Sequence, residues 1–201
     1  MLSVTLKESD KIIQGKIYEA LSKEINSYLS SKSQVVLGAV SNKVLLALMN
    51  SPEILSLKGG KLKADFGLTS DPSSQIVSSI VSTLKLTLTK VNKNLRGGFS
   101  LTMQPNDYSN LLSLSASKQI IEGGAIPWLK WLLTLGDSII IANFGVEYGP
   151  FGRSGMARMT EKQRPFKVDS AYSGNITDNF ITRSIQMNKS SIEEAIVKVL
   201  T

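Results

Sequence analysis

Residues 126–149, "IPWLKWLLTLGDSIIIANFGVEYG", decide the fold that the sequence predicts. Pro127 stands near the start of a short, very apolar run and Gly136 at its end, which predicts a short helix between them. The segment after Gly136 is rich in isoleucine and predicts the most buried strand. The chain is then expected to leave its own domain at Tyr148 and Gly149.

Upstream of this stretch, apolar residues recur at helical spacing. Residues 9–31 predict an amphipathic helix whose apolar face includes Ile17, Leu21 and Tyr28, and residues 33–49 predict a second helix. Ser-Pro at 51–52 interrupts that helix and can open a further turn. Residues 57–68 predict a loop and then a short segment.

The middle and the end of the chain predict both strands and helices. Asp71 and Pro72 start a helix over about 72–91, although "KLTLTKV" at its end alternates like a strand. "FSLTMQ" and "NLLSLS" predict a hairpin, and residues 177–200 return to helix, with Thr177 or Asp178 as cap. The order of elements predicts one α+β domain over 1–201, with a small antiparallel sheet packed by N- and C-terminal helices and a long extended loop at about 149–176.

The 149–176 segment is the most informative feature, because long stretches without secondary structure are uncommon in compact domains. Its apolar and basic residues predict an arm that orders on a neighbouring subunit, and the alternative is a loop folded back on its own domain. We expect deletion of residues 150–170 to leave the core folded and to block assembly. The expected subunit-interface residues are Tyr148, Phe151, Met156, Met159 and Phe166. The expected contacts with partners or DNA are Arg153, Arg158, Lys162, Arg164, Lys167 and Arg183.

The glycines of this segment do not form a phosphate-binding loop. "GPFGRSG" at 149–155 lacks the G-x-x-x-x-G-K-[ST] pattern and does not lead directly into a helix. We therefore expect no nucleotide cofactor at this loop.

The absence of cysteine and histidine excludes several kinds of chemistry. Disulfides, thiolate nucleophiles, zinc sites with the usual ligands and Ser-His-Asp triads all require one of these residues. An enzyme would depend on carboxylates, lysine, tyrosine or an oxygen-bound metal. Asp137, Glu147 and Asp169 could bind Mg²⁺ or could simply be solvated or salt-bridged acids. We expect no catalytic residue, metal or cofactor.

The chain carries a net charge of +7, which is compatible with nucleic-acid contact or with an evenly solvated basic surface. Basic residues cluster at 85–96 and 153–167, without the aromatic residues that would stack on bases. No apolar run approaches the length of a membrane span, and we expect a chain without a signal peptide that is made in a cytoplasm. Trp128 and Trp131 share one helical face and predict either core packing or an interface anchor.

The C-terminal part resembles small virion proteins of tailed bacteriophages. The resemblance rests on "IPWLKWLLTLGDSIII", "VEYG", "GRSGMARM", "PFKV", "YSGNITDNFITRSI" and the upstream "LKGGKLKADFGLTSDPSSQI", so it covers roughly residues 55–200. In the order of its elements the chain is similar to the neck or tail-completion family of head–tail joining proteins. It is longer than the usual members, with extra helix at the N-terminus.

This resemblance implies a structural protein, made in the host cytoplasm, at the neck or tail of the virion. It implies a homo-oligomeric ring of roughly six or twelve copies that joins the connector to the tail. Implied partners are connector or tail proteins, with non-specific contact to genomic DNA and none to a membrane. The alternatives are a non-specific DNA-binding protein acting outside the virion and an enzyme acting on nucleic acid through an oxygen-ligated metal.

Overall fold

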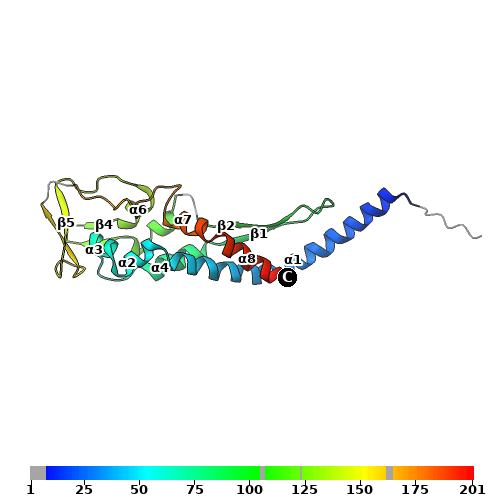
Figure 1. Cartoon of the computed structure of the whole chain (residues 1–201), viewed down its shortest axis with the longest axis horizontal. Coiled ribbons are helices and arrows are strands. Elements are labelled where there is room, and N and C mark those ends of the chain that lie inside the picture. Colours follow the sequence, from blue (N-terminus) through cyan, green and yellow to red (C-terminus); the bar gives the residue numbers. More distant parts are fainter. Residues whose placement is uncertain (1–7, 105–106, 123, 162–164) are drawn as a thin grey trace, which may run out of the picture.

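Helix α1 (Asp10–Met49) runs along most of the molecule and gives it an elongated shape (Figure 1). The computed structural model describes residues 8–104, 107–122, 124–161 and 165–201. At 1.5 Å per residue, α1 is about 60 Å long. The two helices predicted over 9–31 and 33–49 are one helix, because no glycine or proline separates them at residues 31–33.

The hydrophobic core surrounds the second half of α1. It begins at Val36 and includes apolar side chains from α2 (Pro52–Gly59), α3 (Lys61–Phe66) and α4 (Ser73–Ser82). Helices α7 (Phe180–Met187) and α8 (Lys189–Leu200) also pack against α1. Among their side chains, Phe180, Ile181 and Ile192 are buried.

Local capping explains where two of these helices begin. Ser51 accepts a hydrogen bond from the Ile54 amide, and Pro52 occupies the first turn of α2, so the predicted turn at 51–52 is confirmed. Asn179 caps α7 by accepting hydrogen bonds from the Ile181 and Thr182 amides. The predicted caps of this last region, Thr177 and Asp178, are therefore one or two residues too early. No part of 57–68 is a long loop, because α2 and α3 follow each other with only Gly60 between them.

The α+β class is confirmed, and the strands of the described residues form three separate antiparallel pairs. Strand β1 (Lys85–Thr89) pairs with β2 (Gly98–Thr102), β3 (Gln119–Ile121) with β4 (Gly124–Ile126), and β5 (Phe144–Tyr148) with β6 (Ala157–Glu161). The β1–β2 pair packs on α1 and the β5–β6 pair on α3, and the three pairs do not join into a common sheet.

Two predicted elements in this region are confirmed only in part: the helix from about 72 forms as α4 but is shorter, and the hairpin has another partner strand. The helix expected over 72–91 ends at Ser82, because the alternation in "KLTLT" directs Leu86 and Leu88 to one face of a strand. "FSLTMQ" pairs with this strand, with Leu101 opposite Leu86. "NLLSLS", its expected partner, forms α5 (Ser109–Leu112) and the start of the short 3-10 helix at Ser115–Ser117.

Helix α6 (Trp128–Thr134) confirms the helix predicted between Pro127 and Gly136. The rings of Trp128 and Trp131 lie 5.7 and 6.2 Å from the ring of Phe66, so both tryptophans pack on the core. Of the strand predicted over residues 137–149, only the second half forms. Ile139 is 61% exposed, and β5 begins only at Phe144. A turn at Leu135–Ser138 precedes the isoleucines, and the left-handed backbone of Asn143 separates them from that strand.

The 149–176 segment folds back on its own domain, which corrects the expectation of an arm. It contains β6, and the side chains of Ala157, Phe166 and Val168 are buried. The turn of the β5–β6 hairpin requires glycine at position 152, where φ is +74° and a Cβ atom would lie 1.8 Å from the Ala157 carbonyl oxygen. Further along, the Gly174 carbonyl accepts a hydrogen bond from the Gly136 amide, which fastens the segment beside α6.

Within the described ranges, no single helix combines the length and the apolar content of a membrane span. Helices α1 and α2 have that length and apolar content only when they are taken together, as a pair bent by 58°.

Candidate functional site

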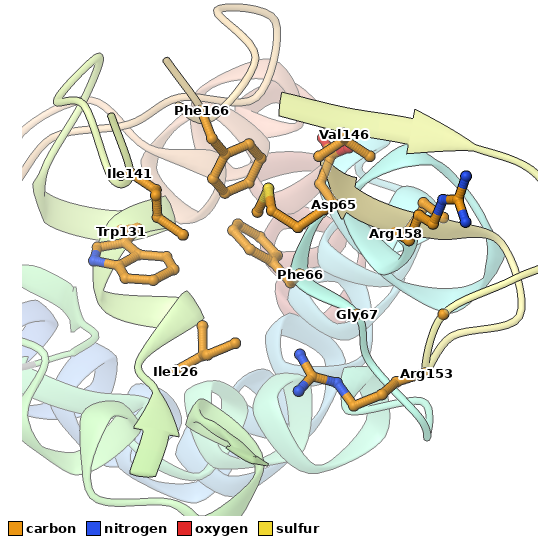
Figure 2. A pocket seen from close by; sticks show the side chains of 14 residues that line it. Asp65, Phe66, Gly67, Ile126, Trp131, Ile141, Val146, Arg153, Arg158 and Phe166 are labelled. Atoms are coloured by element: carbon orange, nitrogen blue, oxygen red, sulfur yellow. The ribbon is translucent and has the colours of Figure 1, made fainter. Parts of the chain in front are cut away.

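A cavity of about 320 Å³ opens between α3, α6 and the β5–β6 hairpin (Figure 2). Three aromatic side chains, Phe66, Trp131 and Phe166, contribute to its wall, and Phe66 and Phe166 are also part of the core. The remaining apolar lining comes from Ile126, Ile141, Val146 and Met159, among others. This cavity, which we call the hairpin pocket, is therefore lined mainly by hydrocarbon.

The C-terminal end of α3 places Phe66 and Gly67 in the wall of the pocket. Gly67 caps this helix with a left-handed backbone, which glycine adopts without steric cost. A Cβ atom on Gly67 would also lie 3.1 Å from Nη2 of Arg153. The same residue thus ends the helix after Phe66 and leaves room for the Arg153 guanidinium.

A hydrogen bond between Tyr148 and Asp65 joins the hairpin to α3. The Tyr148 hydroxyl donates to Oδ1 of Asp65 over 2.6 Å. Burial raises the pKa of the Asp65 carboxyl, and the hydrogen bond from Tyr148 only partly opposes that effect. Burial of the hydroxyl and the bond to Asp65 raise the pKa of Tyr148 as well, so the phenol stays protonated. The pair holds strand β5 against the end of α3.

A charged pair fixes the later part of the 149–176 segment to α3. The ammonium group of Lys61 contacts Oδ2 of Asp169. This contact lowers the pKa of Asp169 and raises the pKa of Lys61. Asp169 also accepts a hydrogen bond from the Ala171 amide, which stabilises the turn after Val168.

Two arginines stand at the rim of the pocket, and they differ in their partners. Arg158 donates from Nε to Glu147 over 2.9 Å and lies 4.6 Å from the ring centre of Phe151. Arg153 makes no hydrogen bond or ion pair with any other residue that the structure describes, and its guanidinium lies beside Gly67 (Figure 2). Arg153 is thus the cation of the rim whose donors remain available to a ligand.

This arrangement is suited to an apolar group that carries a carboxylate close by. The aromatic and aliphatic wall can take the apolar group, and the planar guanidinium of Arg153 matches a carboxylate with two donors. The described residues contain no group of three or more Asp, Glu, His or Cys that could hold a metal ion.

Several of the predicted site residues meet at this place. Arg153, Arg158 and Met159 line the pocket, and Tyr148 and Phe151 belong to the same hairpin. Met156 follows the hairpin turn and is partly buried, and Lys167 is exposed between Phe166 and Val168. Lys162 and Arg164 lie outside the described residues.

Two predicted site residues are engaged inside the chain. Phe166 is 7% exposed and packs in the core, and its ring also contributes to the wall of the hairpin pocket. Arg183 lies on α7, where Nη2 is 2.7 Å from Glu53 and Nη1 is 3.3 Å from Asp178. Its charge is therefore used inside the chain.

The sequence reasoning missed Asp65 and Phe66 as parts of the site. They lie about eighty positions before the hairpin that they contact, a separation across which residue spacing predicts no contact. The one local signal is Gly67 after the apolar pair Leu62 and Phe66, which indicates a helix end.

Comparisons of the chain with known protein families, with characterised proteins and with solved structures found no match.

Proposed function

We propose that this chain is a structural protein of a tailed-phage virion, of the neck or tail-completion kind. It works without catalysis and forms an oligomeric ring that joins the connector to the tail. The proposed position in the virion rests on the sequence resemblance over roughly residues 55–200. The observation that supports a binding role is the hairpin pocket, which is open, apolar and rimmed by Arg153.

In this proposal the hairpin pocket receives a segment of the adjoining connector or tail protein. That segment presents an apolar side chain next to an aspartate or glutamate. Burying a leucine or phenylalanine side chain contributes about 1.5–3 kcal/mol, and a hydrogen bond to a charged group about 1.5–3 kcal/mol. The two together give a weak contact in one subunit, and a ring multiplies it by presenting many copies at once.

An in vitro complementation experiment tests this function. Phage particles that lack the chain are mixed with purified protein, and the recovery of infectious particles is measured. The wild-type protein is expected to restore infectivity. Arg153→Glu is expected to need about tenfold more protein or worse, because it replaces the free cation with a repelling charge.

Lys118→Glu is the matched control, since Lys118 is exposed and does not line the pocket. It makes the same change of charge and is expected to behave as wild type. Equal activity of Arg153→Glu would remove the pocket from the proposal. Failure of the wild-type protein to be taken up by particles would contradict the function itself.

The second candidate, a non-specific DNA-binding protein, is favoured by the turn between β1 and β2. Lys90, Lys93 and Arg96 are all exposed there. The Asn92 side chain accepts hydrogen bonds from the Asn94 and Arg96 amides, so the turn holds its basic residues in place. Such a basic tip can attract phosphates without reading bases.

Salt dependence tests this second candidate. Binding to a short duplex is expected to weaken steeply with salt, and Lys90→Ala is expected to reduce the slope of log affinity against log salt by about 1. Lys118→Ala, at an exposed residue just before β3 and outside this turn, is the control and leaves the slope unchanged. No binding at low salt would reject DNA as a partner.

A further inference from the structure

The first half of α1 exposes the apolar face that the sequence predicts to be buried. Ile17, Tyr18 and Leu21 are 50%, 45% and 43% exposed, and Tyr28 is 41% exposed. Among the described residues, no apolar side chain before Val36 belongs to the core. In Figure 1 the first turns of α1 extend beyond both α8 and the β1–β2 hairpin. Most helical stability in proteins comes from packing an apolar face, and here much of that face is left exposed by its own domain.

These exposed side chains and the partly buried Ile25 form one stripe along the helix. Positions 18, 21, 25 and 28 follow the 3-4-3 spacing of a helix seam, and position 17 lies one turn before 21. We call Ile17, Tyr18, Leu21, Ile25 and Tyr28 the outer stripe. Its spacing is that of a helix packed lengthwise against another helix.

Polar contacts on another face of α1 hold this part of the helix in a fixed direction. Asn26 donates from Nδ2 to the Val91 carbonyl over 2.9 Å and accepts from the Val91 amide over 2.7 Å. Glu19 accepts from Lys93 over 3.2 Å. The β1–β2 hairpin therefore positions α1. At the end of the outer stripe the Tyr28 hydroxyl donates to the Leu200 carbonyl of α8 over 3.0 Å, whereas Ile17, Tyr18 and Leu21 remain exposed.

The charge of the segment favours a copy of itself as the occupant. Residues 10–28 contain three acids (Asp10, Glu19, Glu24) and three lysines (Lys11, Lys16, Lys23), so they are neutral. The whole chain carries +7, and all of that net charge lies outside this segment. Two copies can meet along these helices without the repulsion that the rest of the surface would cause. Helices that lie on membrane surfaces carry a lysine- or arginine-rich polar face, which a neutral segment lacks.

We propose that the outer stripe packs against α1 of a second copy of this chain. The inference rests on the proposed function in one respect, since it identifies the contact through which the ring subunits associate. Helix-to-helix packing would bury Ile17, Leu21 and Ile25, and it would leave the hairpin pocket at the other end of the molecule free for the adjoining protein (Figure 1).

Single-cysteine variants test the inference directly, because the native chain contains no cysteine. Leu21→Cys places a thiol in the outer stripe, and Lys23→Cys places one two residues away, on an exposed position outside the stripe. With mild oxidation, Leu21→Cys is expected to form a disulfide-linked dimer at least about tenfold faster than Lys23→Cys, since packed helices hold their thiols at high effective concentration. Equal rates would overturn the inference.

Sedimentation velocity on the full chain gives a second reading. The wild-type protein is expected to associate as its concentration rises, and Leu21→Glu is expected to remain monomeric with unchanged helix content. A Leu21→Glu variant that associates like wild type would also overturn the inference. So would a monomeric wild-type protein that binds neutral or anionic lipid vesicles through the stripe.

These results separate the inference from the proposed function. Association through the stripe with no uptake of any variant into particles would leave the inference standing and contradict the neck role. Uptake of a Leu21→Glu protein by particles at the wild-type level would contradict the inference and leave the neck role standing.

Discussion

The guanidinium of Arg183 lies 2.7 Å from the carboxylate of Glu53, whose side chain is only 5% exposed. The same guanidinium also donates to the Ser173 carbonyl. A buried carboxylate that loses its partner keeps its desolvation penalty. Arg183 therefore connects α7, α2 and the end of the 149–176 segment at one point.

We expect Arg183→Ala to lower the free energy of unfolding by about 3 kcal/mol, because Glu53 is left buried and unpaired. Urea unfolding followed by circular dichroism measures this change. Lys189→Ala is the control, since Lys189 and Glu193 form an exposed pair 3.8 Å apart that is worth less than about 1 kcal/mol. Similar effects of the two substitutions would show that Glu53 does not depend on Arg183.

The raised pKa of Asp65 predicts that this carboxyl group makes the protein less stable as pH rises, which is the reverse of the usual effect of an aspartate. Burial raises its pKa on folding, so the folded state binds more protons than the unfolded state in the window above the ordinary aspartate pKa. The free energy of unfolding contributed by this group therefore falls as pH rises through that window. At neutral pH the charged carboxylate costs stability.

We expect Asp65→Asn to be more stable than wild type at neutral pH, with the difference shrinking to zero below the ordinary aspartate pKa. The amide oxygen can still accept the hydrogen bond from Tyr148. Denaturant unfolding at several pH values measures the difference. Asp107→Asn should show the opposite sign, because the Ser109 amide lowers the pKa of Asp107. A destabilised Asp65→Asn at neutral pH would contradict the account.

At the scale of elements, the sequence predicts an exposed arm at 149–176 and a buried apolar face on the first half of α1, and the structure shows the reverse for both. The segment supplies the buried side chains of Ala157, Phe166 and Val168, and the helix supplies exposed apolar ones. Removing a buried phenylalanine side chain alone costs about 3–5 kcal/mol, which is comparable to the stability of a small domain.

We therefore expect deletion of residues 150–170 to abolish cooperative unfolding, against the sequence-based expectation of an intact core. Removal of residues 1–18 is the matched control, and it should leave the midpoint of thermal unfolding nearly unchanged while reducing self-association. Circular dichroism during heating distinguishes the two. A cooperative transition in the 150–170 deletion would show that the segment is dispensable for the core.

The elements that the sequence predicts correctly depend on local signals. Pro127 and Gly136 bound a helix, and Ser51 with Pro52 starts another, because capping requires only neighbouring residues. The pairing of β2 with β1 was missed although one turn joins the two strands, because the apolar residues of "KLTLT" also fit the end of the helix that precedes them. The buried strand predicted at the isoleucines does not form there. Hydrophobicity alone does not show whether another element covers a side chain such as Ile139.

The candidate site was predictable in part. Arg153, Arg158 and Met159 could be singled out from composition, because basic and apolar residues concentrate in the hairpin. The other half of the pocket comes from α3 and α6, and only the tertiary structure brings Phe66 and Trp131 to it. Arg183 was misassigned because a sequence does not show that an arginine already has a buried partner.

At the scale of the whole molecule, the first half of α1 lies at one end and the β5–β6 hairpin with α3 at the other (Figure 1). In our proposal the neutral outer stripe of α1 contacts a second copy, and the hairpin pocket, with Arg153 at its rim, contacts the adjoining protein. An elongated subunit with one contact for its own copies and another for the next layer is suited to a ring between two larger assemblies. This separation allows each contact to be removed without disturbing the other.

Immunogold electron microscopy of intact phage particles tests the neck assignment most directly. On the proposed function, antibody raised against the purified chain is applied to phage particles assembled with the chain, with particles lacking it as the control. We predict label at the junction between head and tail. Unlabelled particles, with the protein found only in the soluble fraction of the lysate, would contradict the assignment.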